Sequence, residues 1–253
     1  METEVGPPLF SGALGEGGRE AGGALGRAGG CFVLCTDALA RGGAGGGMHD
    51  FPWTLLLLKM LKSRKPVAVV SANHAREHYE LVLRRHGLDA VKLEAAGLFK
   101  VYILSFANEG NGDTTSWADL VQHLTAGSPK CLFFDDLEAL EALSPAPRAQ
   151  QRALIARMFA QLGDAGRADT LVAFGRRTDL SLEEKDGEPS LCDFCSERAH
   201  VNIRVEPLSS GRSNDAHGIV TITFVGSPPE SEERYTFKVT SSDSVTFSLA
   251  GRC

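Results

Sequence analysis

The stretch that decides the fold is residues 31–62, "CFVLCTDALARGGAGGGMHDFPWTLLLLKMLK". An apolar run is followed by a glycine-rich segment and then by a leucine-rich run with helical character. Strand, glycine loop and helix in this order is the layout of a phosphate-binding P-loop, and Gly42 and Gly47 stand at the G-x-x-x-x-G spacing. Met48 and His49 occupy the next two positions, where a P-loop has Lys and Ser or Thr. The stretch is therefore a phosphate site, the remnant of one, or a plain glycine-rich turn.

A working P-loop needs glycines that let backbone amides converge on the phosphates, a lysine that neutralises their charge and a hydroxyl that ligates Mg²⁺. Met48 offers no charge, and His49 is a poor ligand for an ion that prefers hard oxygens. Loss of one charge-assisted hydrogen bond removes about 1.5–3 kcal/mol, roughly a ten- to hundredfold loss of affinity. Lys59 and Lys62 lie several turns down the expected helix, so we discount them as replacements. We expect no independently hydrolysing site here.

A second candidate site is the acidic pair in "CLFFDDLEAL", residues 131–140. Four apolar residues followed by Asp135 and Asp136 have the form of a Walker B strand, whose terminal carboxylate holds Mg²⁺. Ligands bind at strand ends in open α/β sheets. A carboxylate in this position also commonly caps the next helix, which is the competing interpretation. The pair follows a P-loop-like segment and two intervening strands, and this position strengthens the Walker B interpretation beyond what the short motif alone supports.

The wider pattern predicts an α/β protein. Near-continuous apolar runs are typical of strands covered on both faces of a parallel sheet. We expect such strands at residues 31–36, 66–71, 99–104, 130–134 and 170–174. Helical periodicity lies between them, at residues 74–86, 116–124 and 148–162. From residue 200 onward four segments alternate apolar and polar residues, which predicts an antiparallel meander that extends one edge of the sheet. A parallel sheet continued by antiparallel strands is the plan of RecA-type ATPase cores.

Composition sets limits on domains and location. Of 28 glycines, 15 fall within the first 47 residues, so we expect a flexible lead-in at 1–30 and one RecA-like domain at 31–253. The net charge of −6 argues against tight binding of free nucleic acid by the chain alone. No apolar run reaches the roughly 20 residues that span a bilayer, and the acidic start resembles no presequence. Six cysteines are too sparse for a disulfide scaffold, so we expect a cytoplasmic or nuclear protein without membrane partners.

Three further groups of residues are weaker candidates. Cys192 and Cys195 have CxxC spacing, but they follow an acidic segment, and His200 is the only additional ligand nearby. His74 and His78 stand four apart on an expected helix without an acidic partner, as on a solvated face. Arg176 and Arg177 follow the fifth strand, where RecA-type proteins carry loops that face a central channel, and we expect any contact with tRNA there. We predict no catalytic residue, metal or cofactor.

The order of these pieces, and above all the C-terminal third, resembles the Elongator complex protein 6 family. That family has a segment H-x-x-I-R-x-E-x-L-x-x-G followed by D-x-H-G before its last strands, and a similar final F-x-x-x-D-S-V-x-F-x-x-x-G. The matching residues here are His200, Ile203, Arg204, Glu206, Leu208, Gly211, Asp215, His217 and Gly218, and then Phe237 to Gly251 with one shifted residue. The resemblance covers roughly residues 31–251 and is diffuse.

The resemblance implies a non-catalytic subunit with degenerate Walker motifs. Members of the family form a heterohexameric ring with Elongator proteins 4 and 5. The ring docks on the remaining Elongator subunits, binds tRNA and responds to ATP, whereas another subunit performs the chemistry that modifies wobble uridines. Alternative functions are a RecA-like P-loop ATPase or recombination paralogue with an atypical nucleotide site, and a CxxC redox or zinc protein.

Overall fold

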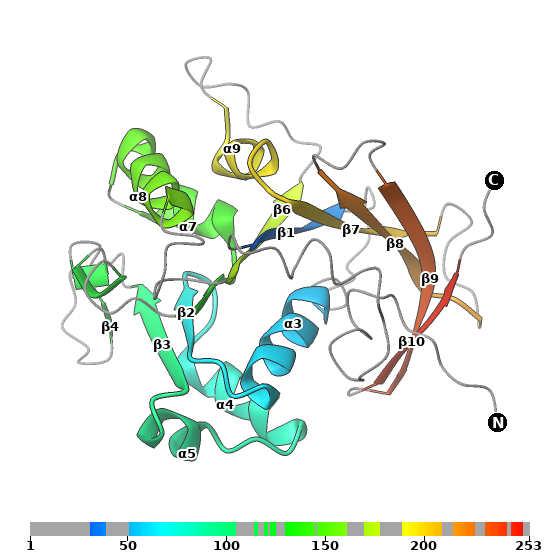
Figure 1. Cartoon of the computed structure of the whole chain (residues 1–253), viewed down its shortest axis with the longest axis horizontal. Helices are drawn as coiled ribbons and strands as arrows, with labels where there is room; N and C mark the ends of the chain where they lie inside the picture. Colours follow the sequence, from blue (N-terminus) through cyan, green and yellow to red (C-terminus); the bar gives the residue numbers. More distant parts are fainter. Residues whose placement is uncertain are drawn as a thin grey trace.

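Ten strands among the described residues pair into one sheet (Figure 1). The computed structural model describes residues 31–38, 51–104, 114–115, 119–120, 122–124, 130–144, 146–160, 170–177, 189–208, 215–225, 231–241 and 244–249. The strands are β1 (Cys31–Ala38), β2 (Val67–Ser71), β3 (Phe99–Leu104), β4 (Thr114–Thr115), β5 (Cys131–Phe134), β6 (Thr170–Arg177), β7 (Val201–Pro207), β8 (Gly218–Phe224), β9 (Ser231–Ser241) and β10 (Ser244–Leu249). Their order across the sheet is β10-β9-β8-β7-β1-β6-β5-β2-β3-β4.

The prediction of a parallel sheet continued by antiparallel strands is confirmed. From β7 to β4 every pairing is parallel, and β8, β9 and β10 are joined in antiparallel register. All five predicted strand runs form strands. One detail differs: β7, which we expected in an antiparallel meander, pairs in parallel with β1 and antiparallel only with β8. The change of direction therefore lies one strand later than predicted.

Helices cover both faces of the parallel strands. On one face lie α3 (Phe51–Lys62), α4 (Arg76–Arg85) and α5 (Ala90–Ala95), and on the other lie α7 (Leu137–Leu143), α8 (Arg148–Ala160) and α9 (Leu191–Ser196) (Figure 1). Residues 119, 120 and 122–124 are also helical and pack on the second face. Alternate residues of β1 enter the two cores, so Val33 packs beneath α3 and Phe32 beneath α8. Both residues have 0% exposure, as expected for a strand covered on both sides.

The helix boundaries follow local chemistry. The helix predicted at 74–86 begins at Arg76 and ends at Arg85, and Gly87 has the positive φ of 74° that suits a residue just past a helix end. The predicted helix 148–162 begins at Arg148 as expected. Helix α5, capped by the Asp89 carboxylate, was not predicted. No helix within the described ranges is long and apolar enough to cross a membrane.

The C-terminal strands have one buried face and one polar face, as predicted. Ile203 of β7, Ile222 of β8 and Phe237 of β9 face the core shared with α3. On the opposite face, the Arg204 guanidinium pairs with the Glu206 carboxylate at 2.7 Å. The meander therefore widens the sheet on one side and adds apolar area only to the α3 side of the core.

Candidate functional site

The candidate site is the edge of the sheet where the parallel strands end. Ser71 is the last residue of β2, Asp135 follows β5, and β6 ends at Arg177 beside the end of β1. Helix α3 begins at the same edge, because the Trp53 indole N–H at its start donates to the Phe134 carbonyl at 2.8 Å. Ligands bind at this edge in open α/β sheets, so the structure brings the Walker B-like strand and the helix after the glycine loop together.

The Asp135 carboxylate is the centre of a buried hydrogen-bond network. Its Oδ2 accepts hydrogen bonds from the Ser71 hydroxyl at 2.5 Å and from the Tyr79 hydroxyl at 2.6 Å. Its Oδ1 accepts the backbone N–H of Ala72 at 2.9 Å. The Ser71 hydroxyl in turn accepts the backbone N–H of His74 at 3.0 Å. This one carboxylate therefore joins the end of β5 to the end of β2 and to α4.

The network leaves Asp135 poorly placed to hold a metal ion. The residue is 8% exposed, and Tyr79, which covers it, is 1% exposed. Oδ2 already accepts two hydrogen bonds and Oδ1 one, so the protein fills three of the roughly four lone-pair positions of this buried carboxylate. Ser71 and Tyr79 were not predicted from the sequence. Their signals were slight: a polar residue that ends an apolar strand, and a phenol on the apolar stripe of the next helix.

The neighbouring carboxylate of Asp136 has a different role. Its Oδ1 accepts the backbone N–H groups of Glu138 at 3.0 Å and Ala139 at 2.9 Å, which makes it the N-cap of α7. The capping interpretation is thus confirmed for Asp136. Strand alternation explains the division, because Phe133 faces the α3 side and Phe134 faces the α7 side, so Asp135 returns to the α3 side.

Aromatic side chains fix the start of α3. The Trp53 ring packs edge-on against Phe133 with centroids 5.4 Å apart, and the Phe51 ring lies 4.7 Å from that of Phe237 on β9. These contacts hold the first turn of α3 between β5 and the meander. The candidate phosphate loop itself, with Gly42, Gly47, Met48 and His49, lies outside the described residues, so its predicted role stays a prediction.

Lys59 lies at the wrong edge of the sheet to replace the missing P-loop lysine. Burial lowers its pKa, the nearby Lys65 charge lowers it further, and Cys31 opposes both effects. Cys31 is the first residue of β1, at the edge opposite to Asp135. Lys59 therefore cannot take the place of the P-loop lysine from this position.

Arg176 and Arg177 belong to the last part of β6. Their backbones are in register with Asp37 and Ala38 at the end of β1, so they lie at the candidate edge, close to where the glycine loop leaves the sheet. Their side chains are outside the described part of the chain. The proposed contact with tRNA is not tested by this placement and stays a prediction.

The CxxC pair lies in a structural context that we did not expect. Cys192 and Cys195 belong to α9, which connects β6 to β7 as a parallel crossover. Both thiols are buried, and burial, followed by the nearby Cys192, raises the pKa of Cys195, so Cys195 does not resemble an activated thiolate. A Cβ on Gly175 of β6 would come within 2.7 Å of the Cys192 sulfur, so these cysteines fill space between strand and helix.

The residues of the C-terminal motif have structural roles. His200 Nδ1 accepts the backbone N–H of Phe32 at 2.9 Å, and His217 Nδ1 accepts that of Val239 at 3.1 Å. Each histidine thus bridges two chain segments at the end of a strand. A Cβ on Gly218 would lie 2.5 Å from the Glu206 carbonyl, so only glycine fits there. Within the described ranges no group of three or more His, Cys, Asp or Glu side chains is arranged to hold a metal ion.

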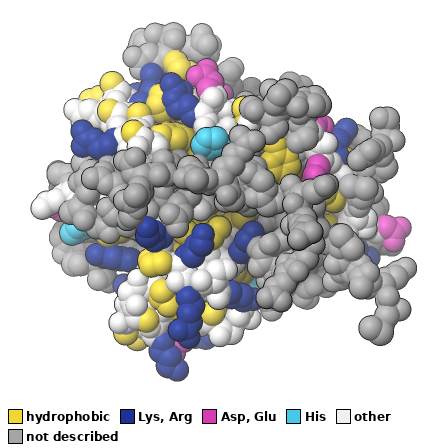
Figure 2. Space-filling model, in the orientation of Figure 1, with side chains coloured by type: hydrophobic (Ala, Val, Ile, Leu, Met, Phe, Trp, Pro, Cys, Tyr) yellow, Lys and Arg dark blue, Asp and Glu magenta, His cyan; other side chains and the backbone are white. Residues whose placement is uncertain are grey.

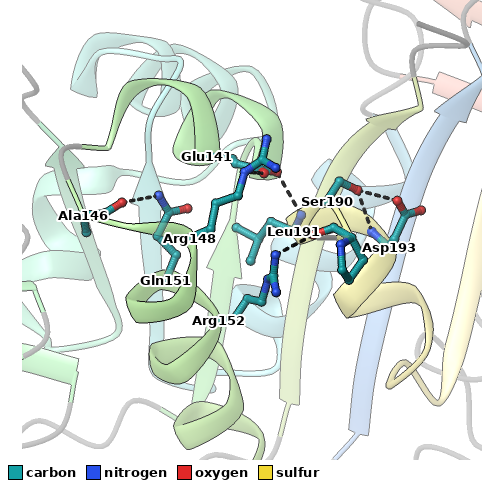
Figure 3. Close-up of polar contacts among 9 residues, drawn as sticks. Glu141, Ala146, Arg148, Gln151, Arg152, Ser190, Leu191 and Asp193 are labelled. Carbon is teal, nitrogen blue, oxygen red and sulfur yellow. Dashed lines mark hydrogen bonds and ion pairs between the residues drawn. The ribbon is translucent and has the colours of Figure 1, made fainter. Parts of the chain in front are cut away.

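A second polar network attaches α9 to the two helices beside it (Figure 3). The Glu141 carboxylate on α7 pairs with the Arg148 guanidinium of α8 at 2.5 Å and accepts the backbone N–H of Leu191 at 2.8 Å. The Arg152 guanidinium donates to the Pro189 carbonyl at 2.8 Å. Glu141 therefore places a negative charge at the start of α9, where the helix dipole favours one. The arrangement anchors α9 to α7 and α8.

Comparison with solved structures identifies the architecture. The chain is similar to the flagellar accessory protein FlaH from Methanocaldococcus jannaschii, with a TM-score of 0.60, 12% identity and coverage of 94% of this chain and 98% of that one. It is also similar to the KaiC-like protein PH0186 from Pyrococcus horikoshii OT3, with a TM-score of 0.56, 13% identity and coverage of 87% and 90%. The fold is RecA-like. No protein-family model and no curated protein sequence matches the chain.

Identity at this level shows the fold and leaves function open. The RecA-like architecture explains why β1, the glycine-rich segment and α3 follow one another, and why the strand with the acidic pair lies one strand away from β1 across β6. The edge of the sheet where ligands bind in open α/β folds is therefore present in this structure. Ser71, Tyr79 and Asp135 are joined there in one hydrogen-bonded network.

Proposed function

We propose that this chain is a non-catalytic RecA-like subunit of the Elongator complex, equivalent to Elongator complex protein 6. In this proposal it joins Elongator proteins 4 and 5 in a heterohexameric ring and supports modification of tRNA wobble uridines through complex assembly and tRNA binding and release. The ring docks on the remaining Elongator subunits in the cytoplasm and nucleus. The resemblance of residues 200–251 to that family supports the identity, and the RecA-like fold is compatible with it.

The observation that carries the non-catalytic part is the occupied carboxylate of Asp135. A Walker B carboxylate must be able to hold Mg²⁺, directly or through water. Here Ser71, Ala72 and Tyr79 supply hydrogen bonds to both of its oxygens inside the protein. The nucleotide side also lacks the lysine and hydroxyl of a P-loop, because Met48 and His49 stand in their places.

A structural role requires surfaces that neighbours can cover. RecA-type domains assemble through heterologous contacts, in which two different surfaces of one subunit meet two neighbours, and these contacts close only with the right partners. Arg176 and Arg177 lie at the edge that would face the channel of such a ring, which is why we keep them as the tRNA contact in this proposal.

Affinity purification from cells followed by mass spectrometry tests the assignment. The expected result is recovery of the other Elongator subunits, with Elongator proteins 4 and 5 retained at high salt. Co-expression of the three proteins should yield one hexameric species by light scattering, with higher thermal stability than the single chain. Recovery of none of these subunits, and no gain in thermal stability on mixing, would overturn the proposal.

The RecA-like fold itself favours a second candidate, an ATPase or recombination paralogue with an atypical nucleotide site. Nucleotide binding by the isolated chain separates the two. Micromolar, magnesium-dependent ATP binding that Asp135→Ala abolishes would support the ATPase. The structural subunit predicts no such binding, together with loss of stability in the same variant.

A further inference from the structure

Positive charge is concentrated in one part of this acidic protein. Residues 51–104, which form α3, β2, α4, α5 and β3, contain nine Lys and Arg against four Asp and Glu, a net charge of +5 in a chain of −6. The remainder of the chain therefore carries −11. Figure 2 shows Lys and Arg side chains gathered over the lower part of the molecule, where Figure 1 places these three helices. The chain thus has a basic region despite its overall charge.

Five residues form what we call the basic surface: Lys62, Arg64, Lys65, Arg84 and Arg85. The first three lie at and just after the end of α3, and the other two end α4. Both helices start at the edge that carries Asp135 and lie on the same face, so they end together at the opposite edge. Four of the five side chains are exposed, and Lys65 is half-buried.

The acidic residues of this region do not neutralise the basic surface. Glu80 and Glu94 both pair with Arg76, and Asp89 pairs with Lys92. None of the five basic side chains forms an ion pair with a residue in the described ranges. Their charge is therefore available to a partner of opposite sign.

The backbone of Arg64 gives a second, independent indication. Its φ is 55°, whereas the other described residues with positive φ are glycines. The Arg64 N–H donates to the Leu61 carbonyl and the Lys65 N–H to the Met60 carbonyl, both at 3.0 Å, in the Schellman pattern that ends a helix. Glycine is the favoured residue at this position. Attraction to a helix dipole explains basic residues in a last turn, but it does not explain an arginine in a left-handed conformation.

The surroundings indicate the chemistry of the partner. Large apolar residues exposed on this region are two single side chains, Leu81 on α4 and Val91 on α5. A protein interface needs a buried apolar core, and a peripheral membrane site needs an apolar face to insert, so neither class fits well. Arginine guanidinium groups match phosphate oxygens in a planar fork, and lysines add point charges.

We propose that the basic surface binds the phosphodiester backbone of an RNA. The surface is at the edge opposite to Arg176 and Arg177, so it is a separate contact from the one already considered. The choice of a tRNA as the RNA rests on the proposed function, whereas the surface and its phosphate chemistry do not. Five phosphate contacts to a duplex region predict a slope of about −4.5 for log affinity against log salt concentration.

Fluorescence anisotropy with a labelled tRNA transcript, titrated with the full-length chain at several low salt concentrations, tests the proposal. Arg84→Gln/Arg85→Gln removes two contacts, so we expect the slope to fall by about 2 and the affinity near 0.1 M salt to fall roughly 60-fold. The matched control is Arg157→Gln/Arg234→Gln, which removes two exposed arginines from α8 and β9. The control should leave slope and affinity unchanged, and equal losses in the two variants would overturn the proposal.

Arg64→Gly distinguishes loss of contact from loss of folding. Glycine relieves the left-handed backbone, so the variant should melt at a higher temperature and still bind RNA more weakly, with a slope lower by about 1. Unchanged RNA binding in this variant and in Arg84→Gln/Arg85→Gln would contradict the proposal.

Two further measurements distinguish RNA binding at the basic surface from membrane binding and from the proposed function. Vesicles with anionic phosphatidylserine should not compete with tRNA, and if the variants weaken only vesicle binding, a membrane is the partner and the proposal is wrong. In the ring with Elongator proteins 4 and 5, unchanged tRNA affinity of the variants would show that the basic surface does not bind tRNA, while the proposed function would stand. If no ring forms, the proposed function fails, and the titration of the chain alone still decides the surface.

Discussion

Removal of the Asp135 carboxylate should lower the free energy of unfolding and leave nucleotide binding unaffected. Asp135→Ala leaves the Tyr79 hydroxyl and the Ala72 N–H without their acceptor in a buried site, whereas the Ser71 hydroxyl can still donate to the His74 carbonyl at 2.7 Å. An unsatisfied buried donor costs about 1–3 kcal/mol, so two of them predict a loss of at least about 2 kcal/mol. That is a large share of the about 5–15 kcal/mol that stabilises a typical protein.

Tyr79→Phe measures one arm of the network in isolation. The ring is retained, so the expected loss is that of one hydrogen bond to a charged group, about 1.5–3 kcal/mol. Tyr102→Phe is the matched control, because Tyr102 is 8% exposed and its hydroxyl donates to no acceptor in the described part of the chain. The control should change stability by less than about 0.5 kcal/mol.

Urea unfolding followed by circular dichroism gives the free energy of each variant, and calorimetric titration with Mg²⁺ and ATP gives nucleotide affinity. We expect Asp135→Ala to unfold at much lower urea concentration, and neither wild type nor variant to bind ATP. The reasoning is refuted if Asp135→Ala stays within about 1 kcal/mol of wild type and abolishes measurable ATP binding. That result would make the carboxylate a metal ligand.

Three other changes test separate features of the structure. Arg64→Gly should raise the free energy of unfolding by about 1 kcal/mol, because it relieves a left-handed arginine, and a decrease in urea unfolding would contradict this. Burial raises the pKa of the Cys31 thiol from 9.0 to about 11, so the unfolded chain ionises first as pH rises. The stability from the protonated thiol is thus fully present below pH 9.0 and is lost as the pH rises towards 11. The free energy of unfolding should fall by at least about 1 kcal/mol between about pH 8 and about pH 10. Urea unfolding curves that coincide at these two pH values would refute the prediction. Glu141→Ala should cost about 2 kcal/mol by removing the acceptor of the Leu191 N–H and the partner of Arg148, and protease cleavage near residue 190 should accelerate.

The strands could be predicted well because their apolar runs coincide with burial on both faces. The prediction failed at strand ends, where pairing continues between polar residues. β1 extends to Ala38 and β6 to Arg177, since Asp37 and Arg176 still lie in register beyond the apolar runs of the two strands. Backbone pairing needs no apolar side chain, so a hydrophobic pattern cannot mark these ends.

The direction of β7 and the presence of helix α5 could not be predicted from the hydrophobic pattern, for two other reasons. An alternating strand looks the same whether its neighbour is parallel or antiparallel, so the parallel pairing of β7 with β1 left no signal. Helix α5 has six residues, less than two turns, which is too short to show a period. The helix around Cys192 and Cys195 was missed for the same reason.

The candidate site was half predictable. The acidic pair was correctly placed at a strand end. Because side chains alternate along a strand, Asp135 lies on the same side of the sheet as Phe133, the side covered by α3. Its partners could not be found, because Ser71 and Tyr79 lie 64 and 56 residues away in the sequence. Ser71 meets Asp135 through the pairing of β2 with β5, and Tyr79 meets it from α4 in the crossover between β2 and β3. Whether a carboxylate is open or satisfied depends on such distant donors.

The strand order has a consequence for how the chain can be linked to others. Nine gaps of about 4.8 Å separate β10 from β4, so the two rims of the sheet lie about 43 Å apart. A neighbouring domain less than about 43 Å across that packs on β10 cannot also contact β4. The sheet therefore has two distant edges, β10 in antiparallel pairing and β4 in parallel pairing, which are far enough apart for two separate molecules to approach at once.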